Sequence, residues 1–576
     1  MRNFIISLFL IFTAGASIAQ EIRGVVINTN NQPIAQALIY SAGDQHHTHS
    51  DLLGKFTLNK VGIGDTIIAS FLGFESYSKI ITASDLEFPL EIKLEEKYFE
   101  LEQVNITNSL KSISKVASID LLTRPVKSSQ EILTRVPGLF IAQHAGGGKA
   151  EQIFLRGFDI DHGTDIGIQV DGIPVNMVSH AHGQGYADLH FVIPETIENI
   201  DFSKGPYEAK AGNFSTAGHI DFRLKEQLDN SMFSIEAGAF NSRRILTMLD
   251  LMQDADDQSM YFAGEYQESD GPFESPQNFR RINLLGKYHR SFKDNSRLNV
   301  TLSRFSSNWD ASGQIPNRLV ANGQISRFGA VDDTEGGTTS RTNILLDHTK
   351  TIDNQSFIKT KGFYSLYDFT LFSNFTFFLE NPGLGDQIRQ KEKRSTIGLE
   401  SVLYKSHSHA SSNQELQIGL GFRYDDIKGS ELSNTLQRTD ILNRISFGDI
   451  DETNIYGFIN WEYNKDRWLV NVGTRLDYFD FQYKDHLLPQ YEVNSRNILR
   501  LSPKINFLYN PNRDLQLFMK SGIGFHSNDT RVIINREAEE ILPAAYGLDL
   551  GSIWKPFKNL WISSTHWYLY LEQEFV

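Results

Sequence analysis

Residues 466–480 read DRWLVNVGTRLDYFD. Large apolar residues recur at every second position of this run, namely Trp468, Val470, Val472, Leu476 and Tyr478. Polar or small residues stand between them: Asn471, Gly473, Arg475 and Asp477. Because side chains alternate between the two faces of a strand, this pattern predicts a strand with one apolar and one polar face. A strand of this length with aromatic ends fits an outer-membrane barrel, whose apolar face meets lipid and whose other face lines a polar interior.

The same alternation recurs from residue 230 onwards and predicts about fifteen antiparallel strands. Short connections alternate with long ones along this region. The short connections are residues 293–295, 353–355, 464–466, 510–514 and 556–559. The long connections are residues 306–338, 373–392, 427–451, 482–496 and 525–541. Short turns at one rim and long loops at the other are typical of outer-membrane barrels, in which the short turns are periplasmic.

The odd number of predicted strands has a consequence for the barrel. The last strand, Leu560 to Val576, would run towards the long loops, and the sequence stops inside it. Closed bacterial barrels normally have an even number of strands. We therefore expect a C-terminally incomplete transmembrane β-barrel that lacks several closing strands.

Composition excludes several classes of protein. The formal net charge is −15, which argues against a nucleic-acid-binding protein, because such proteins need a basic face. Cysteine is absent, so disulfides, thiolate metal sites and cysteine nucleophiles are excluded. The sequence contains no phosphate-binding loop, no Gly-x-Ser-x-Gly and no His-Glu-x-x-His, so we predict no catalytic residues and no enzyme activity.

The N-terminus has the pattern of a secretory signal peptide over residues 1–19. Arg2 supplies a positive charge, residues 4–12 are apolar except for Ser7, and Ser17 and Ala19 are small residues before a cleavage point. The alternative is a membrane anchor, but the apolar run is shorter than the roughly 18–20 residues that a spanning helix needs. An exported β-rich chain without cysteine indicates the Gram-negative outer membrane and contact with its lipid.

The composition and the hydrophobic patterning of the sequence divide the rest of the chain into four parts. Residues 20–95 contain short alternating runs separated by turn residues, which predicts a small β-sandwich. Residues 96–118 are polar and read as a linker. Residues 119–226 mix strands, a short helix and glycine-rich loops, which predicts a small α+β domain, and residues 227–576 form the partial barrel.

Residues 119–226 resemble the plug domain of TonB-dependent outer-membrane receptors. The resemblance rests on a series of short motifs in the family's order: Val136-Pro137-Gly138-Leu139, Leu155-Arg156-Gly157-Phe158, Val170-Asp171-Gly172-Ile173-Pro174, Ile197-Glu198-Asn199-Ile200 and Lys204-Gly205-Pro206. Each motif alone is weak, but the ordered series is specific. Receptors of this kind have about 22 strands around a plugged lumen, which agrees with a missing end.

Residues 20–95 resemble the carboxypeptidase-regulatory-like domain that precedes the plug in many Bacteroidetes receptors. The matching residues are Gly24, Pro33, Asp51, Gly54, Phe56, Gly73 and Phe74. The domain carries no zinc-hydrolase motif, so the resemblance does not imply a peptidase.

The linker contains a candidate TonB box: Glu102, Gln103, Val104, Asn105, Ile106 and Thr107. An extended segment that alternates Val104 and Ile106 can add a strand to a partner's sheet through its backbone. The alternative is the last strand of the sandwich. The resemblance implies that the partner is TonB, acting with ExbB and ExbD to supply energy from the periplasm.

Two plug motifs look functional, but we interpret them as structural. We expect Arg156, beside Gly157, to pair with acidic residues inside the lumen. Asp171 and Gly172 form a turn signal.

Four residues in the plug are candidate metal ligands: His180, His182, Asp188 and His190. In an extended segment, residues two apart face the same side, so His180 and His182 would reach one ion, and imidazole suits Fe, Zn or Cu. Glycines between the two pairs would let the chain fold back. The alternative is a plug loop whose histidines hydrogen-bond to carboxylates of the barrel wall.

The expected function is import of a scarce nutrient, most simply a metal ion or a metal chelate such as an iron–siderophore, by TonB-coupled active transport of a small extracellular ligand. The alternatives are import of an oligosaccharide or peptide, and a passive barrel or adhesin. A signalling transducer is a further class, but it normally carries a different N-terminal domain.

Overall fold

The computed structural model describes residues 21–29, 31–41, 47–71, 74, 77–95, 126, 129–143, 147–160, 163–228, 230–252, 257–353, 355–409, 412–490, 492–535, 540–557 and 560–573. The expected signal peptide and linker lie outside these residues. The chain forms two compact units, residues 1–107 with 408–410, and residues 108–407 with 411–576. Among the described residues, no helix combines the length and apolar character needed to span a bilayer.

The first unit contains two small sheets that enclose one apolar core. Their strand orders are β4–β1–β7 and β3–β2–β5–β6. The elements are β1 (Glu21–Asn28), β2 (Leu38–Ser41), β3 (His47–His49), β4 (Lys55–Asn59), β5 (Thr66–Ser70), β6 (Tyr77–Ile80), α1 (Ala83–Glu87) and β7 (Leu90–Leu94). Alternate residues point inwards, and Ile22, Ile39 and Ile92 are fully buried in the shared core. The predicted small β-sandwich is confirmed.

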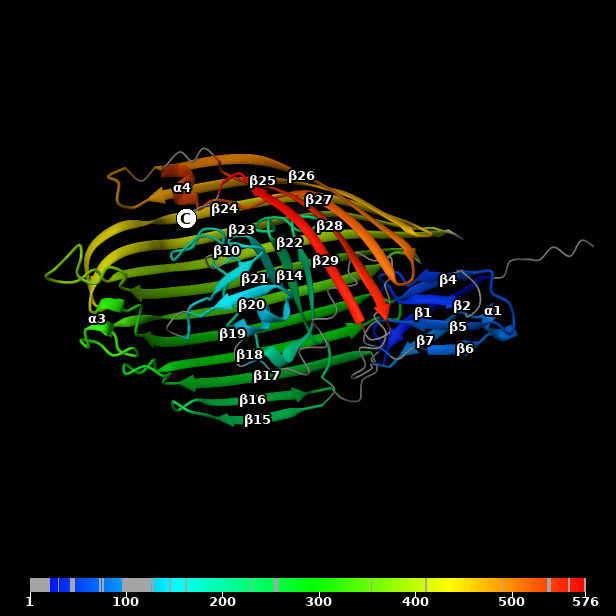
Figure 1. Ribbon diagram of the computed structural model, residues 1–576, viewed down its shortest axis with the longest axis horizontal. Helices are drawn as coiled ribbons and strands as arrows, with labels where there is room; N and C mark the ends of the chain where they lie inside the picture. The colour runs from blue at the N-terminus through cyan, green and yellow to red at the C-terminus, as the bar shows by residue number, and fades with distance from the viewer. Residues whose placement is uncertain are drawn as a thin grey trace, which may run out of the picture. The chain divides into compact units, whose positions relative to one another are not determined.

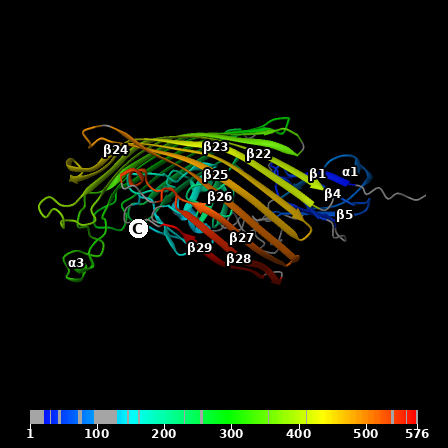
Figure 2. The ribbon, with the colours of Figure 1, turned by 90° about the horizontal axis from the view of Figure 1, so that it is seen from above.

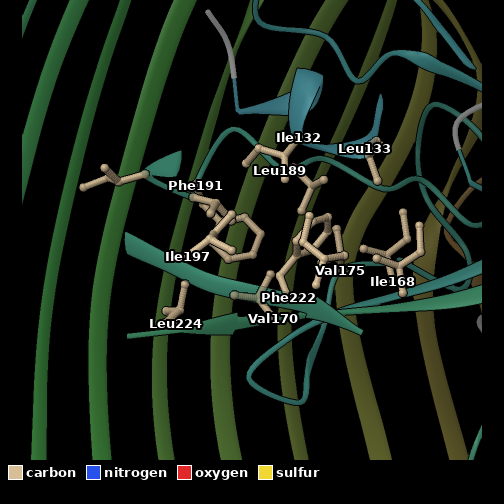
Figure 3. Close-up of a cluster of buried hydrophobic side chains, with 14 of the residues drawn as sticks. Ile132, Leu133, Ile168, Val170, Val175, Leu189, Phe191, Ile197, Phe222 and Leu224 are labelled. Atoms are coloured by element: carbon tan, nitrogen blue, oxygen red, sulfur yellow. The ribbon is translucent and has the colours of Figure 1, made fainter. Parts of the chain in front are cut away.

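The second unit begins with two further small sheets, ordered β10–β9–β8 and β12–β11–β14–β13. The elements are the 3-10 helix η2 (Gln130–Arg135), β8 (Leu139–Ala142), β9 (Gln152–Leu155), β10 (Phe158–Ile160), β11 (Ile166–Val170), β12 (Ile173–Pro174), the 3-10 helix η3 (Pro194–Thr196), β13 (Ile197–Lys204) and β14 (Gly218–Leu224). We call this region the plug. Figure 3 shows its apolar core, in which Ile132, Leu189 and Phe222 gather above the central strands.

Fifteen strands in chain order form one antiparallel sheet, which we call the wall (Figures 1 and 2). They are β15 (Met232–Ala237), β16 (Arg243–Asp250), β17 (Gln258–Ser269), β18 (Phe279–Ser291), β19 (Arg297–Ala311), β20 (Glu335–Thr351), β21 (Ser356–Ser373), β22 (Ile388–His409), β23 (Ser412–Leu436), β24 (Asp440–Lys465), β25 (Trp468–Asp485), β26 (Val493–Asn512), β27 (Leu515–Phe525), β28 (Ala544–Phe557) and β29 (Leu560–Leu571). The strand count and the barrel-and-plug fold class agree with the prediction.

The wall packs against the plug along most of its strands, because side chains on strands from β16 to β28 hydrogen-bond to the plug. Arg244 on β16 bonds to Glu195, Arg341 on β20 bonds to the Pro174 carbonyl, and Asp549 on β28 accepts bonds from Arg156. The alternation read from residues 466–480 is present in β25: Trp468 and Leu476 are exposed, whereas Asn471 and Arg475 are buried on the inner side. The inner face is thus polar and packed against the plug.

One predicted long loop, residues 427–451, is wrong. β23 continues to Leu436 and β24 begins at Asp440, so a tight turn at Gln437 and Arg438, with φ of 47° and 63°, joins two very long strands. The register between these strands shifts between Ile427 and Ser430 and again at Leu432. Each shift changes which face a residue occupies, so the sequence loses its period of two even though the strands continue.

Candidate functional site

The segment between β12 and η3 folds back on itself as a loop that reaches the end of the wall carrying the long connections. Met177 N–H donates to Tyr186 O (3.0 Å), and Gly185 N–H donates to Val178 O (3.1 Å). The Asn176 side chain fixes the base of the loop by accepting from Ile168 N–H at 2.7 Å. We call residues 178–185 the apex loop.

His180 points into a buried aromatic and polar environment. Its ring stacks on Tyr186 with centroids 4.2 Å apart, and its Nε2 lies 3.2 Å from the Tyr367 hydroxyl on β21. Only 1% of His180 is exposed. Burial lowers the pKa of His180 well below its usual 6.5, and the nearby Arg394 and Arg531 lower it further. His180 is therefore a neutral, enclosed side chain.

His182 has different surroundings, although it is only two residues away. Its Nδ1 lies 2.8 Å from Gln390 Oε1 on β22, and the residue is half-buried. A Cβ added at the next residue, Gly183, would meet no atom within 4 Å, so open space lies beside it. His182, Gly183 and Gln184 are all half-buried. We call these three residues the apex tip, because they are the accessible part of the loop.

Asp188 and His190 lie inside the plug rather than at the tip. Asp188 Oδ1 is 2.6 Å from His190 Nδ1, and Gln130 Nε2 is 3.3 Å from the same ring nitrogen. Burial would raise the pKa of Asp188, but the contact with His190 outweighs it and holds the pKa below its usual value. Asn283 on β18 donates to the His190 carbonyl at 2.8 Å.

The four candidate metal ligands therefore have different partners. His180 meets Tyr367, His182 meets Gln390, and Asp188 pairs with His190. In the part of the chain that the structure describes, no three or more His, Asp or Glu side chains are arranged to hold a metal ion.

An acidic and a basic residue of the wall hold the backbone of the apex loop. Ala181 N–H donates to Glu392 Oε2 (2.8 Å), and Arg394 donates to the Ser179 carbonyl. Arg394 also bonds to Glu392 and to Asp425, each at 3.0 Å. These wall residues were not singled out from the sequence. The predicted loop 373–392 ended at Glu392, whereas β22 begins at Ile388 and carries both Glu392 and Arg394.

The two plug motifs interpreted as structural both attach the plug to the wall. Arg156, with φ of 55°, makes a bidentate interaction with Asp549, in which its two terminal nitrogens donate to the two carboxylate oxygens at 3.0 and 2.5 Å. Asp171 accepts from Lys287 Nζ at 2.7 Å, and its carbonyl accepts from Lys361 Nζ at 2.7 Å.

Both motifs also need their glycine. Gly157 and Gly172 have φ of 82° and 96°, in the left-handed region that favours glycine. A Cβ at Gly172 would also lie 2.6 Å from Lys361 Nζ. The candidate TonB box, residues 102–107, lies outside the described residues.

Family models match three parts of the chain. A CarboxypepD_reg-like domain matches residues 22–106, a TonB-dependent receptor plug domain matches residues 105–219, and a TonB-dependent receptor-like β-barrel matches residues 272–539. The first match extends over most of residues 102–107, so the alternative of a last sandwich strand stays open for that segment.

Individual proteins show the same likeness. The vitamin B12 transporter BtuB of Vibrio vulnificus is 24% identical over 191 residues, which are 32% of this chain and 30% of BtuB. The unliganded ferric citrate transporter FecA superposes with a TM-score of 0.65 at 14% identity, over 76% of this chain and 66% of FecA. The copper transporter OprC gives 0.59 at 14% identity, over 75% and 67%. At these identities the structures show a shared fold, and the chain spans under a third of BtuB.

Proposed function

The chain belongs to the TonB-dependent receptor family, whose members are outer-membrane β-barrel receptors and transporters and not enzymes, and from this premise we propose that it imports a scarce nutrient by active transport. The observation that carries the proposal is the plug itself. Its apolar core continues into the wall, where Leu246, Tyr261 and Leu285 join the same cluster. A passive porin or an adhesin needs no such plug, so the structure favours gated import.

The proposed site of first contact with the ligand is the apex tip, residues 182–184. It combines open space beside Gly183 with an imidazole and an amide, and it lies near the ends of β21 and β22 that carry a long connection. The ligand that this tip suits best is a metal ion or a metal chelate of Fe, Zn or Cu, since imidazole is a common ligand of these metals. The ferric citrate and copper transporters support this choice.

An organic nutrient is the second candidate. It is favoured by the absence, among the described side chains, of a group of three metal ligands, and by the likeness to a vitamin B12 transporter. An oligosaccharide or a peptide would use the same tip through hydrogen bonds of the amide and the imidazole.

The proposal extends to export and energy coupling. Residues 1–19 would direct export and be removed after Ala19, and the mature chain would then insert into the outer membrane. Residues 102–107 would pair with TonB, which ExbB and ExbD energise. Pairing of this kind uses the backbone N–H and C=O groups of an extended strand.

Substitutions at the box test the energy coupling. Replacing Val104 and Ile106 by Pro removes two N–H donors and should abolish uptake, whereas binding of ferric citrate, Zn²⁺ or Cu²⁺ at the cell surface should persist. Replacing the same two residues by Ala keeps both donors and is the matched control, which should retain most of the uptake. Uptake of all three probes at the parental rate in the Pro variant would exclude energy coupling through this segment.

A further inference from the structure

The first part of the connection between β27 and β28 packs against the plug. It begins with His526-Ser527-Asn528-Asp529-Thr530-Arg531, and Thr530 opens the short helix α4 (Thr530–Asn535). The first five of these residues are buried, and Ser527, Asn528 and Thr530 have no exposed surface. We call residues 526–531 the bracket.

Five of the six bracket residues hydrogen-bond to the plug. His526 Nδ1 lies 3.0 Å from Asp165 Oδ1, and Ser527 N–H donates to Asn213 Oδ1 at 2.8 Å. The remaining three contact the apex loop. Asp529 N–H donates to Gln184 Oε1 (2.9 Å), Thr530 N–H donates to Ser179 Oγ (2.8 Å), and Arg531 donates to the His180 carbonyl (2.7 Å).

Ser179, Thr530 and Glu452 form the centre of this contact. Thr530 Oγ1 donates to Glu452 Oε1 at 2.6 Å, and Ser179 Oγ donates to the same carboxylate. The two hydroxyl oxygens are 3.1 Å apart. One residue comes from the plug, one from the bracket and one from wall strand β24, so this node joins three separate segments.

An apolar cluster backs the node. Val178 and Phe214 of the plug pack with Ile533 of α4 and with Phe479 and Phe481 of β25. The bracket is therefore held to the wall on one side and to the apex loop on the other. Because polar groups buried in this way are costly to leave unpaired, the contact resists opening.

We propose that the bracket is the positioning segment of the apex loop, and that the Thr530 hydroxyl sets how often the loop leaves its closed position. The bracket need not touch the ligand, since it acts through Ser179, His180 and Gln184. This inference goes beyond the proposed function, because it concerns the resting position of the plug and holds whichever ligand is transported.

The test uses the absence of cysteine from the chain. Ala181 lies within the apex loop and is only 5% exposed, so A181C places a single small thiol where a reagent reaches it only when the loop opens. The rate at which a membrane-impermeant maleimide labels this thiol in intact cells then reports the open fraction.

Adding Thr530→Val to A181C removes the hydroxyl and keeps the volume. We expect labelling to accelerate about tenfold, which corresponds to about 1.4 kcal/mol. Thr530→Ser, which keeps the hydroxyl, should restore the parental rate. Ser179→Ala removes the second hydroxyl of the node and should accelerate labelling to a similar extent, so the test does not depend on one variant reaching the membrane.

Thr360→Val is the matched control, because the Thr360 hydroxyl also makes a 2.9 Å bond, to Ser401 on the neighbouring strand, but far from the apex loop. It should leave labelling unchanged. Equal rates in the parent, Thr530→Val and Ser179→Ala would overturn the proposal, as would equal acceleration by Thr360→Val. Neither result depends on uptake, so a failure here is distinguishable from a failure of the proposed import.

Discussion

His180 is held as an uncharged imidazole in the folded protein, and this has a consequence for stability. Burial, followed by Arg394 and Arg531, lowers its pKa well below 6.5. In the unfolded chain a histidine has a pKa of about 6.5 and binds a proton below that pH. The unfolded state therefore binds more protons than the folded state as the pH falls through about 6.5, and acid favours unfolding.

We predict that the stability of the plug–wall unit falls as pH is lowered from 7.5 to 5.5, with His180 contributing up to about 1.4 kcal/mol per pH unit. His180→Gln should flatten this pH dependence. His182→Gln, at the half-buried neighbour, is the control and should leave it nearly unchanged. Thermal unfolding of the purified protein in detergent at several pH values measures the difference, and identical pH profiles for the parent and His180→Gln would contradict the prediction.

Gly183 offers a direct test of the apex tip. Because its added Cβ would meet only open space, Gly183→Leu should fold normally and fill that space. We expect it to weaken ligand binding by at least about tenfold, equivalent to about 1.4 kcal/mol. Calorimetric titration with Zn²⁺, Cu²⁺ and ferric citrate measures the affinity. Gly286→Leu on β18, which also meets no atom within 4 Å, is the matched control. Parental affinity in Gly183→Leu for every probe that the parent binds would exclude the tip as the contact site.

The sequence pattern identified the apex loop as a candidate site. It did not predict that His180 and His182 contact different residues of the wall. The expectation that His180 and His182 share a face assumes an extended strand. The segment instead turns between Val178 and Gly185. Contacts from Tyr367, Gln390 and Arg531, between 187 and 351 residues away, decide which imidazole is enclosed. No local pattern encodes such contacts.

At the scale of elements, the turn at Asp171 and Gly172 is an anchor between plug and wall. Burial would raise the pKa of Asp171, but Lys287 foremost, with the Leu224 N–H and Lys361, holds it below its usual value. The side chains of Lys287 and Asp171 are 4% and 14% exposed, so the pair is well shielded from water.

We predict that Asp171→Asn destabilises the plug–wall unit by about 3 kcal/mol, because it leaves the Lys287 charge buried without its partner. Calorimetric unfolding measures the loss. Asp353→Asn, at a solvent-exposed turn between β20 and β21, is the matched control and should unfold as the parent does. A variant as stable as the parent would mean that the lysines hold the turn through Asp171 O and Leu224 O alone.

Elements with regular alternation were predictable, and those with interrupted alternation were not. β25 keeps its period of two throughout, and the sequence assigned both of its faces. β23 and β24 contain register shifts, and residues 427–436 of β23 and 440–451 of β24 were assigned to a loop. The buried position of the bracket was not predictable, because a polar segment that follows a strand has the sequence pattern of a surface loop. Its contacts depend on residues that are distant in the sequence.

At the scale of the whole molecule, short-range periodicity was enough to predict the sandwich and the barrel, whereas the plug was predicted from the resemblance of its ordered motifs to those of a known family. Neither the periodicity nor the motifs specify how the plug is attached to the wall. Its attachments come from wall strands β16 to β28 and join residues as far as 393 positions apart.

The attachment of the plug to the wall also implies an order of events during biogenesis. The plug is synthesised before every strand of the wall, yet Arg156 pairs with Asp549 on β28, and Ser179 pairs with Thr530 at the start of α4. Contacts of such long sequence separation form late and slowly. Until β27 and β28 have been added to the wall, the plug of a newly exported chain therefore lacks the bonds from Arg156 to Asp549 and from Thr530 to Ser179. During that interval Arg156 and Ser179 are open to chaperones and proteases, so the addition of these two strands to the wall also protects this part of the plug.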